Sequence, residues 1–291
     1  MLNPDRVYML AADHRWQWEE FCDARGISRD RISEAKRVAY DGFAAARRDS
    51  PAVAQFGAML LDEQYSSAII AEGVGNGWEI GTPAEKAGAF PLAWASDPFD
   101  RALTGTFVKV LLKYRPDHDA AIREEQLSKL QRLHEWCERA ARPLVIEILV
   151  PRDCEDEREF DAKGRPAIVA AVIRDAYWRQ LTPAFWKIEG TASHEGAAII
   201  DAAVAEHPRG RHIILGKAAD LATIGDWFAA AAGSSRAAGF AIGRSVFWQP
   251  CADYLCGLIT AGEAAAAVAD NYAQLIHVWG GDRRGQRDPG G

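Results

Sequence analysis

The sequence predicts a parallel α/β fold, a (β/α)8 TIM barrel that forms a single domain over residues 1–280. Short apolar runs alternate with long helical patterns along the whole chain, and eight such runs can be distinguished. The length of 291 residues, of which 48% are hydrophobic, suits a barrel of about 250 residues. No GxGxxG segment follows the first run, which argues against a dinucleotide-binding sheet.

The apolar runs give the predicted strands, and the segments between them give the helices. The strands are expected at 7–12, 57–61, 77–81, 107–114, 144–150, 185–189, 211–216 and 239–243. Helices are expected through Arg48, at 117–140, 167–179, 195–206 and 220–232, and in two final segments that reach Trp279. The third run is the weakest of the strands. We also expect an acidic loop at 153–161 and a disordered tail at 281–291.

Composition narrows the class of protein. The net charge of −7 argues against a nucleic-acid binder, which needs a basic face. The five cysteines are scattered without a CxxC pair, which indicates structural thiols in a reducing compartment. The first residues lack the features of a signal peptide, and no apolar segment is long enough to span a membrane. We therefore expect a cytoplasmic protein; the sequence allows a homo-oligomer.

A lysine stands in the middle of the sixth apolar run. Because side chains alternate along a strand, Lys187 and Glu189 should face one side while Trp186 and Ile188 face the other. Burial disfavours an ammonium group, so we expect a lowered pKa for Lys187 and a neutral amine that can form a Schiff base with a ketone. A strand lysine whose head reaches water is the structural alternative.

Polar residues recur where the predicted strands end, which is where α/β barrels place their active sites. These residues are Asp13, Arg15, Asp62, Gln64, Lys109, Lys113, Glu147, Lys187, Glu189, Lys217 and Arg244. Chains commonly become polar at strand ends, but so many charged residues there favour a functional site.

Two inward-facing lysines would suit Schiff-base chemistry. Lys109 beside Lys187 would lower the pKa of its neighbour by like-charge repulsion. Retro-aldol cleavage also needs a base at the hydroxyl group that loses its proton, and Asp13 and Glu147 are the candidate carboxylates. A plain ion pair between Glu147 and Lys109 is the alternative, and it is compatible with catalysis. No metal is expected, because the seven histidines show no HxH or HxxxH pairing.

The seventh and eighth strands are predicted to end in a phosphate site. Gly243 ends the eighth strand where a helix begins, so backbone N–H groups are free to bind an anion, and Arg244 adds positive charge. Gly216 and Lys217 follow the seventh strand. In barrels of this kind, phosphate commonly binds after these two strands.

Several of these segments resemble one enzyme family. They are LAADHR at 10–15, LLDEQY at 60–65, VKVLL at 108–112, VIEI at 145–148, WKIE at 186–189, GFAIGRSVF at 239–247 and NYAQLI at 271–276. The sequence resembles the class I, tagatose-bisphosphate-like aldolases. It is most similar to the 5-dehydro-2-deoxyphosphogluconate aldolase domain often fused behind 5-dehydro-2-deoxygluconokinase in inositol catabolism. The resemblance covers about residues 7–279.

The resemblance implies a role for each matching residue. Lys187 would form the Schiff base, Lys109 would be its cationic neighbour, Asp13 and Glu147 would be acid/base or positioning groups, and Gly243 and Arg244 would hold phosphate. One departure is Gln64, because the tagatose-bisphosphate branch tends to carry Glu there. Substrate contacts are expected from Arg15, Gln64, Glu189, Gly216, Lys217, Gly243 and Arg244.

The implied reaction cleaves 6-phospho-5-dehydro-2-deoxy-D-gluconate to dihydroxyacetone phosphate and malonate semialdehyde, without a cofactor. Arg15 is the candidate for binding the substrate carboxylate, since a guanidinium can form a bidentate pair with it; a surface arginine that opens a helix is the alternative. Other functions remain open: an aldolase for another ketose (bis)phosphate or sulfo-sugar phosphate, a carboxylate-based isomerase or epimerase, and a non-catalytic sugar-phosphate-binding barrel.

Overall fold

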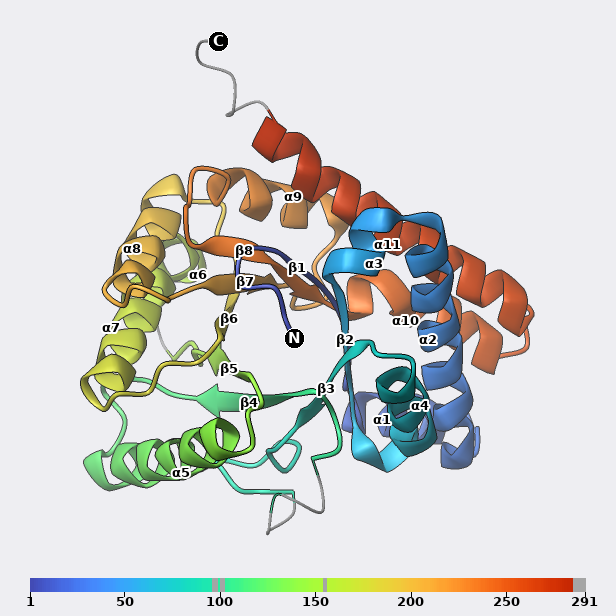
Figure 1. Cartoon of the computed structure of the whole chain (residues 1–291), viewed down its shortest axis with the longest axis horizontal. Helices are drawn as coiled ribbons and strands as arrows, with labels where there is room; N and C mark the ends of the chain where they lie inside the picture. Colours follow the sequence, from blue (N-terminus) through green and yellow to red (C-terminus); the bar gives the residue numbers. More distant parts are fainter. Residues whose placement is uncertain (96–98, 100–102, 154–155, 285–291) are drawn as a thin grey trace.

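The computed structural model describes residues 1–95, 99, 103–153 and 156–284. Its strands form one closed parallel barrel in chain order, in which β8 pairs with β1 (Figure 1). The strands are β1 Val7–Ala12, β2 Gly57–Leu61, β3 Glu79–Pro83, β4 Phe107–Lys113, β5 Leu144–Leu149, β6 Phe185–Glu189, β7 His212–Leu215 and β8 Ala237–Ile242. The predicted (β/α)8 TIM barrel is confirmed.

The α-helices surround the barrel, and α11 packs against α2 and α10 (Figure 1). They are α1 Trp16–Asp23, α2 Ile32–Asp49, α3 Pro51–Phe56, α4 Glu63–Gly75, α5 Ala120–Arg139, α6 Glu157–Glu159, α7 Arg165–Trp178, α8 His194–Ala205, α9 Leu221–Ala230, α10 Arg244–Leu255 and α11 Ala261–Arg284. Several begin at a capping side chain. Asp62, Ser193 and Asp220 each accept a hydrogen bond from a backbone N–H in the first turn of α4, α8 and α9.

The alternation of side chains divides the core into an inner and an outer layer. On β6, Trp186 and Ile188 belong to the cluster between sheet and helices, whereas Phe185 lies in the separate cluster inside the barrel. The inner cluster contains Phe107, Val145 and Phe185 near the strand starts. Further along β4, β5 and β6, the same inner face carries Lys109, Glu147 and Lys187 instead of apolar residues. The barrel is therefore apolar at its base and charged at its mouth.

A glycine makes room for this apolar base. The aromatic ring of Phe107 lies so close to Gly81 on β3 that a Cβ atom there would be 2.1 Å from the ring. Any side chain at position 81 would displace Phe107 from the barrel interior. Glycine in this strand therefore reflects a close approach between layers of the core.

The structure shifts some predicted boundaries. Gly77, with φ of 72°, follows the C-terminal cap of α4, so β3 begins at Glu79 and continues to Pro83 rather than occupying 77–81. The expected acidic loop at 153–161 includes α6, whose first turn is capped by the Asp156 carboxylate. Helix α11 continues to Arg284, and residues 285–291 of the predicted tail lie outside the described residues.

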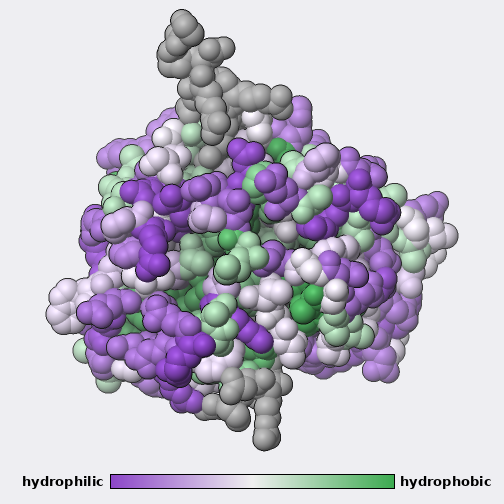
Figure 2. All heavy atoms as spheres, viewed as in Figure 1, coloured by the Kyte–Doolittle hydropathy of each residue, from purple (hydrophilic) through white to green (hydrophobic). Residues whose placement is uncertain are grey.

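Figure 2 shows one face of the molecule, which is largely hydrophilic with hydrophobic side chains near its centre. A cavity of about 300 Å³ lies at the end of the barrel where the strands begin, and its lining includes Leu2, Leu144 and Phe185. In the described ranges, no helix combines the length and the apolar character that crossing a bilayer requires.

Candidate active site

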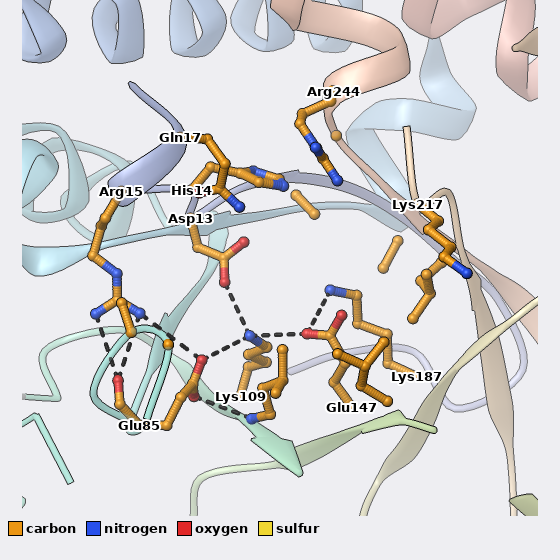
Figure 3. A pocket seen from close by; sticks show the side chains of 18 of the residues that line it. Asp13, His14, Arg15, Gln17, Glu85, Lys109, Glu147, Lys187, Lys217 and Arg244 are labelled. Atoms are coloured by element: carbon orange, nitrogen blue, oxygen red, sulfur yellow. Dashed lines mark hydrogen bonds and ion pairs between the residues drawn. The ribbon is translucent and has the colours of Figure 1, made fainter. Parts of the chain in front are cut away.

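A pocket of about 290 Å³ lies at the carboxyl ends of the strands (Figure 3). Its charged lining residues are Asp13, Arg15, Glu85, Lys86, Lys109, Lys113, Glu147, Lys187, Lys217 and Arg244. The predicted glycines Gly216 and Gly243 also line it. The structure thus brings most of the predicted site residues together, although they come from segments far apart in the sequence.

Five of these residues form what we call the lysine–carboxylate cluster: Asp13, Glu85, Lys109, Glu147 and Lys187. The Nζ atom of Lys109 lies 2.8 Å from Glu85 Oε1, 2.8 Å from Glu147 Oε2 and 3.2 Å from Asp13 Oδ2. The Nζ atom of Lys187 lies 2.9 Å from the same Glu147 Oε2. Glu147 therefore joins the two lysines (Figure 3).

Strand register accounts for this arrangement. Glu147 on β5 is the register partner of Lys187 on β6, so their side chains leave the sheet side by side on its inner face. Lys109 on β4 pairs with Val145, two residues before Glu147, which places it on the same face. Lys109 and Lys187 are 3% and 5% exposed, so both amines lie at the bottom of the pocket.

The cluster is strongly coupled electrostatically. Burial alone would raise the pKa of Asp13, but the charges of Lys109 and Lys187 bring it far below its ordinary value. Burial also opposes charge on Lys109, yet Asp13, Glu147 and Glu85 raise its pKa well above the usual range. For Glu147, the two lysines outweigh burial and lower the pKa. Near neutral pH, Asp13 and Glu147 are therefore ionised and Lys109 is an ammonium ion.

This result modifies one sequence-based expectation. Lys109 is a charged neighbour of the Schiff-base candidate, as predicted. However, three carboxylates surround its ammonium group, at the distances given above. The charge of Lys109 is thus matched within the cluster and does not act on Lys187 as an isolated positive charge.

A second buried ion pair lies behind the pocket. Lys36 on α2, 1% exposed, is 2.7 Å from the Oδ2 atom of Asp62. Its ammonium group also donates hydrogen bonds to the carbonyl oxygens of Ala12 and, at 2.6 Å, of His14. Because these two residues flank Asp13, Lys36 fixes the backbone that carries this carboxylate.

His14 lines the pocket next to Asp13, but the sequence analysis gave it no role. Burial lowers the pKa of His14 to about 3; Asp13 opposes this shift, while Lys36, Arg244 and Lys187 add to it. Its ring packs edge-on against Phe247, with 5.8 Å between the ring centroids. The imidazole is therefore neutral at physiological pH. The signal in the sequence was its place directly after Asp13.

The second group in the pocket is the anion corner, defined by Gly216, Lys217, Gly243 and Arg244. Helix α10 begins at Arg244, directly after Gly243, and no side chain caps this end. A Cβ atom at position 243 would lie 1.8 Å from the carbonyl oxygen of Ala11, so only glycine fits. The first N–H groups of a helix point outward with partial positive charge, which suits a phosphate.

Arg244 and the turn after β7 complete the anion corner. Burial lowers the pKa of Arg244, and its Nε atom has no hydrogen-bond partner among the described residues. After Gly216, Lys217 and Ala218 have φ values of 46° and 61°, and Ala219 N donates to Gly216 O at 2.8 Å. Such turns can form concave backbone sites for anions.

Glu85 is a site residue that the sequence analysis missed. It lies two residues beyond β3, in the Pro- and Gly-rich segment that follows the weakest predicted strand. Besides contacting Lys109, its Oε2 atom accepts a hydrogen bond from Leu111 N at 3.2 Å. A carboxylate shortly after a predicted strand was the available signal, but the strand had been predicted to end at residue 81.

Four predicted substrate-binding residues have protein partners: Arg15, Gln64, Glu189 and Lys217. Nη1 and Nη2 of Arg15 are each 3.5 Å from the Glu85 carbonyl oxygen, and Nη2 lies 3.9 Å from the Glu85 carboxylate. Gln64 is not among the pocket-lining residues; its amide donates to Glu19 Oε1 at 3.2 Å, because it lies in the first turn of α4 beyond the strand end. Glu189 also lies outside the lining set.

The carboxylate of Glu189 is buried below the anion corner. Its Oε1 atom lies 2.7 Å from Lys217 Nζ and 3.7 Å from Arg165 Nε. The Lys217 side chain is 55% exposed, but its ammonium group contacts the buried Glu189 carboxylate. No group of three or more His, Cys, Asp or Glu residues in the described part of the chain is arranged to hold a metal ion.

Three solved aldolase structures are similar in fold to this chain. A fructose-bisphosphate aldolase from Plasmodium falciparum, solved with TRAP and a small-molecule inhibitor, has a TM-score of 0.65 and 13% identity, covering 98% of this chain and 93% of that chain. A Schiff base-forming fructose-1,6-bisphosphate aldolase (TM-score 0.54, 17% identity) covers 91% and 94%. An archaeal fructose 1,6-bisphosphate aldolase (0.54, 17%) covers 93% and 95%. The chain is thus similar in fold to class I aldolase barrels.

Comparison of the sequence with family models identifies the family of this chain. The model of the DUF2090 family, described as "Uncharacterized protein conserved in bacteria", matches residues 2–283. The chain belongs to the DUF2090 family. No curated protein sequence matches it.

Proposed function

We propose that the protein is a Schiff-base aldolase that cleaves a keto-sugar phosphate. The observation that carries this proposal is the buried amine of Lys187, 2.9 Å from Glu147 Oε2, in the same pocket as the anion corner. A nucleophilic lysine needs an adjacent group to accept its proton, and Glu147 is in position to do so. The fold shared with aldolases agrees with this function.

The proposed reaction begins with attack of Lys187 Nζ on the substrate ketone, with loss of water, to form an iminium ion. A carboxylate, Asp13 or Glu147, then takes the proton of the hydroxyl two carbons from the iminium carbon. The bond between the hydroxyl-bearing carbon and the carbon next to the iminium carbon breaks, an aldehyde leaves, and the electron pair of that bond forms an enamine. Protonation of the enamine carbon and hydrolysis release the ketone product and restore Lys187. Lys109 stays charged throughout and holds the carboxylates in place.

The proposed substrate is 6-phospho-5-dehydro-2-deoxy-D-gluconate, and this assignment rests on the sequence resemblance. Attack at the C5 ketone and cleavage of the C3–C4 bond would yield dihydroxyacetone phosphate and malonate semialdehyde. The phosphate would bind in the anion corner, which places the ketone towards Lys187. Other ketose phosphates fit the same chemistry.

Borohydride trapping tests the function directly. With dihydroxyacetone phosphate, reduction should fix the sugar on a peptide that contains Lys187, as detected by mass spectrometry, and EDTA should leave turnover intact. Lys187→Met should abolish labelling and cleavage, whereas Lys163→Met, at an exposed ion pair with Glu195, should preserve both. Labelling at another lysine, or cleavage that survives in Lys187→Met, contradicts the assignment of Lys187 as the Schiff-base residue. Absence of both labelling and cleavage in the wild type would favour an isomerase or a binding protein.

A further inference from the structure

The two ends of the pocket lie on opposite sides of the barrel. In a closed barrel of eight strands in chain order, β4 lies across from β8. The anion corner follows β7 and β8, so the opposite end of the pocket is formed by β4 and by the loop after β3. Lys113 lines this far end. It is four residues beyond Lys109 on the same face of β4, and therefore about 13 Å further along the strand in the direction of the mouth.

Ion pairing distinguishes the cations of this pocket. Lys109, Lys187, Lys217 and Arg15 each have a carboxylate within 4.0 Å. Among the described residues, no carboxylate lies within that distance of Lys113, of Arg244 or of the exposed Lys86. Positive charge without a protein counter-ion is thus present at both ends of the pocket. The middle, in contrast, is balanced by its own carboxylates.

The guanidinium of Arg15 already has protein partners in this structure. It lies against the backbone carbonyl and the carboxylate of Glu85. A substrate anion would have to compete with Glu85 for this group. Lys113 has no such competing carboxylate in the part of the chain that the structure describes, and the partial burial of its side chain reduces screening by water.

We infer that Lys113 binds a second anionic group of the substrate, at the end remote from the phosphate. This inference rests on the proposed function and narrows it: the substrate is a ketose phosphate with a carboxylate or a second phosphate at its other end. After cleavage, this second group remains on the aldehyde product. Lys113 therefore recognises the aldehyde half, whereas the anion corner recognises the ketone half.

The test uses the condensation reaction of the full-length enzyme. Dihydroxyacetone phosphate is combined with malonate semialdehyde, with glyceraldehyde 3-phosphate, or with uncharged propionaldehyde. For Lys113→Met, we expect kcat/KM to fall by about tenfold to a hundredfold for the better anionic aldehyde, the range for a lost hydrogen bond to a charged group. With propionaldehyde, the variant should have the same kcat/KM as the wild type. A larger fall in kcat/KM for malonate semialdehyde would identify a carboxylate as the ligand of Lys113. A larger fall for glyceraldehyde 3-phosphate would identify a phosphate.

Two control variants and the trapping assay separate the possible failures. Lys113→Arg keeps the charge and should retain the preference for anionic aldehydes, and Lys163→Met should behave as the wild type. Equal losses for charged and uncharged aldehydes, or no loss, overturn the role of Lys113. If the wild type also fails to be trapped with dihydroxyacetone phosphate alone, the aldolase function itself falls, and the inference falls with it.

Discussion

The lysine–carboxylate cluster and the anion corner share one pocket but are built from different parts of the chain. The cluster consists mainly of side chains inside or just beyond strands, such as Lys109, Glu147 and Lys187, which hold one another through ion pairs of 2.8–3.2 Å. The anion corner consists of a helix start and a left-handed turn after two strands, where glycine and backbone N–H groups matter most. In the proposed function, the cluster performs the chemistry and the anion corner binds the phosphate.

This difference predicts separable effects of substitution. Side-chain changes in the cluster should alter the rate of the chemical step, because its groups face the reacting atoms in the proposed function. Changes in the anion corner should alter binding of the phosphorylated substrate. His14, whose pKa is influenced by both Lys187 and Arg244, lies between the two halves.

After loss of Lys187 itself, the largest effect in this comparison is expected at Glu147. Glu147→Gln keeps the shape of the side chain but removes the charge that joins both lysines. We expect kcat to fall by about 10²- to 10⁴-fold, the usual contribution of a general acid or base, while KM changes much less. Steady-state cleavage kinetics measure both. Glu135→Gln, at an exposed position on α5, should match the wild type; a variant at Glu147 that changes only KM would assign this residue to binding.

A smaller effect is expected at Arg244. Arg244→Ala should weaken transition-state binding of a phosphorylated substrate by about 1.5–3 kcal/mol, the range for hydrogen bonds to charged groups. The unphosphorylated analogue should be almost unaffected when kcat/KM is compared. Lys217→Met should cost less, because Lys217 Nζ is already 2.7 Å from Glu189. An equal loss of kcat/KM for both substrates would assign Arg244 a structural role. It would also contradict the separation of the pocket into a catalytic and a phosphate-binding half.

The smallest effect is expected in the pH dependence of stability. The folded pKa of His14 is lowered to about 3 from an ordinary value of 6.5, so below pH 6.5 the unfolded chain binds the proton that the folded chain excludes. The free energy of unfolding should therefore fall with decreasing pH, by at most about 1.4 kcal/mol per pH unit from this group. Above pH 6.5, His14 is neutral in both the folded and the unfolded chain, so this loss of stability is absent.

Urea denaturation at pH 7.0, 6.0 and 5.5 measures this dependence. This range lies above the ordinary pKa values of carboxyl groups, so it isolates the histidine from most of the cluster. His14→Gln should lose less stability than the wild type between the first and last pH. Parallel losses in the two proteins would show that the imidazole of His14 can accept a proton in the folded state.

The sequence by itself determined on which face of its strand Lys187 lies. Alternation with a period of two placed Lys187 on the inner face of β6 and Trp186 on the outer face, and the structure has the same strand bounds, Phe185–Glu189. Gly243 and Arg244 were recognised because a strand end and a helix start meet there. These features depend on residues that are neighbours in the chain, so a local pattern contains them.

Only the tertiary structure decided how the charges pair. Lys109 meets three carboxylates from three segments, Glu85 enters the pocket from a loop of irregular sequence, and Arg15 pairs with Glu85. Lys36, which reads as an ordinary helical lysine, is buried against the ends of β1 and β2. An ion pair forms between the groups that the folded backbone brings within about 4 Å, and each group has many candidate partners of opposite charge in the sequence. Which partner is reached depends on barrel closure and strand register, which no local pattern specifies.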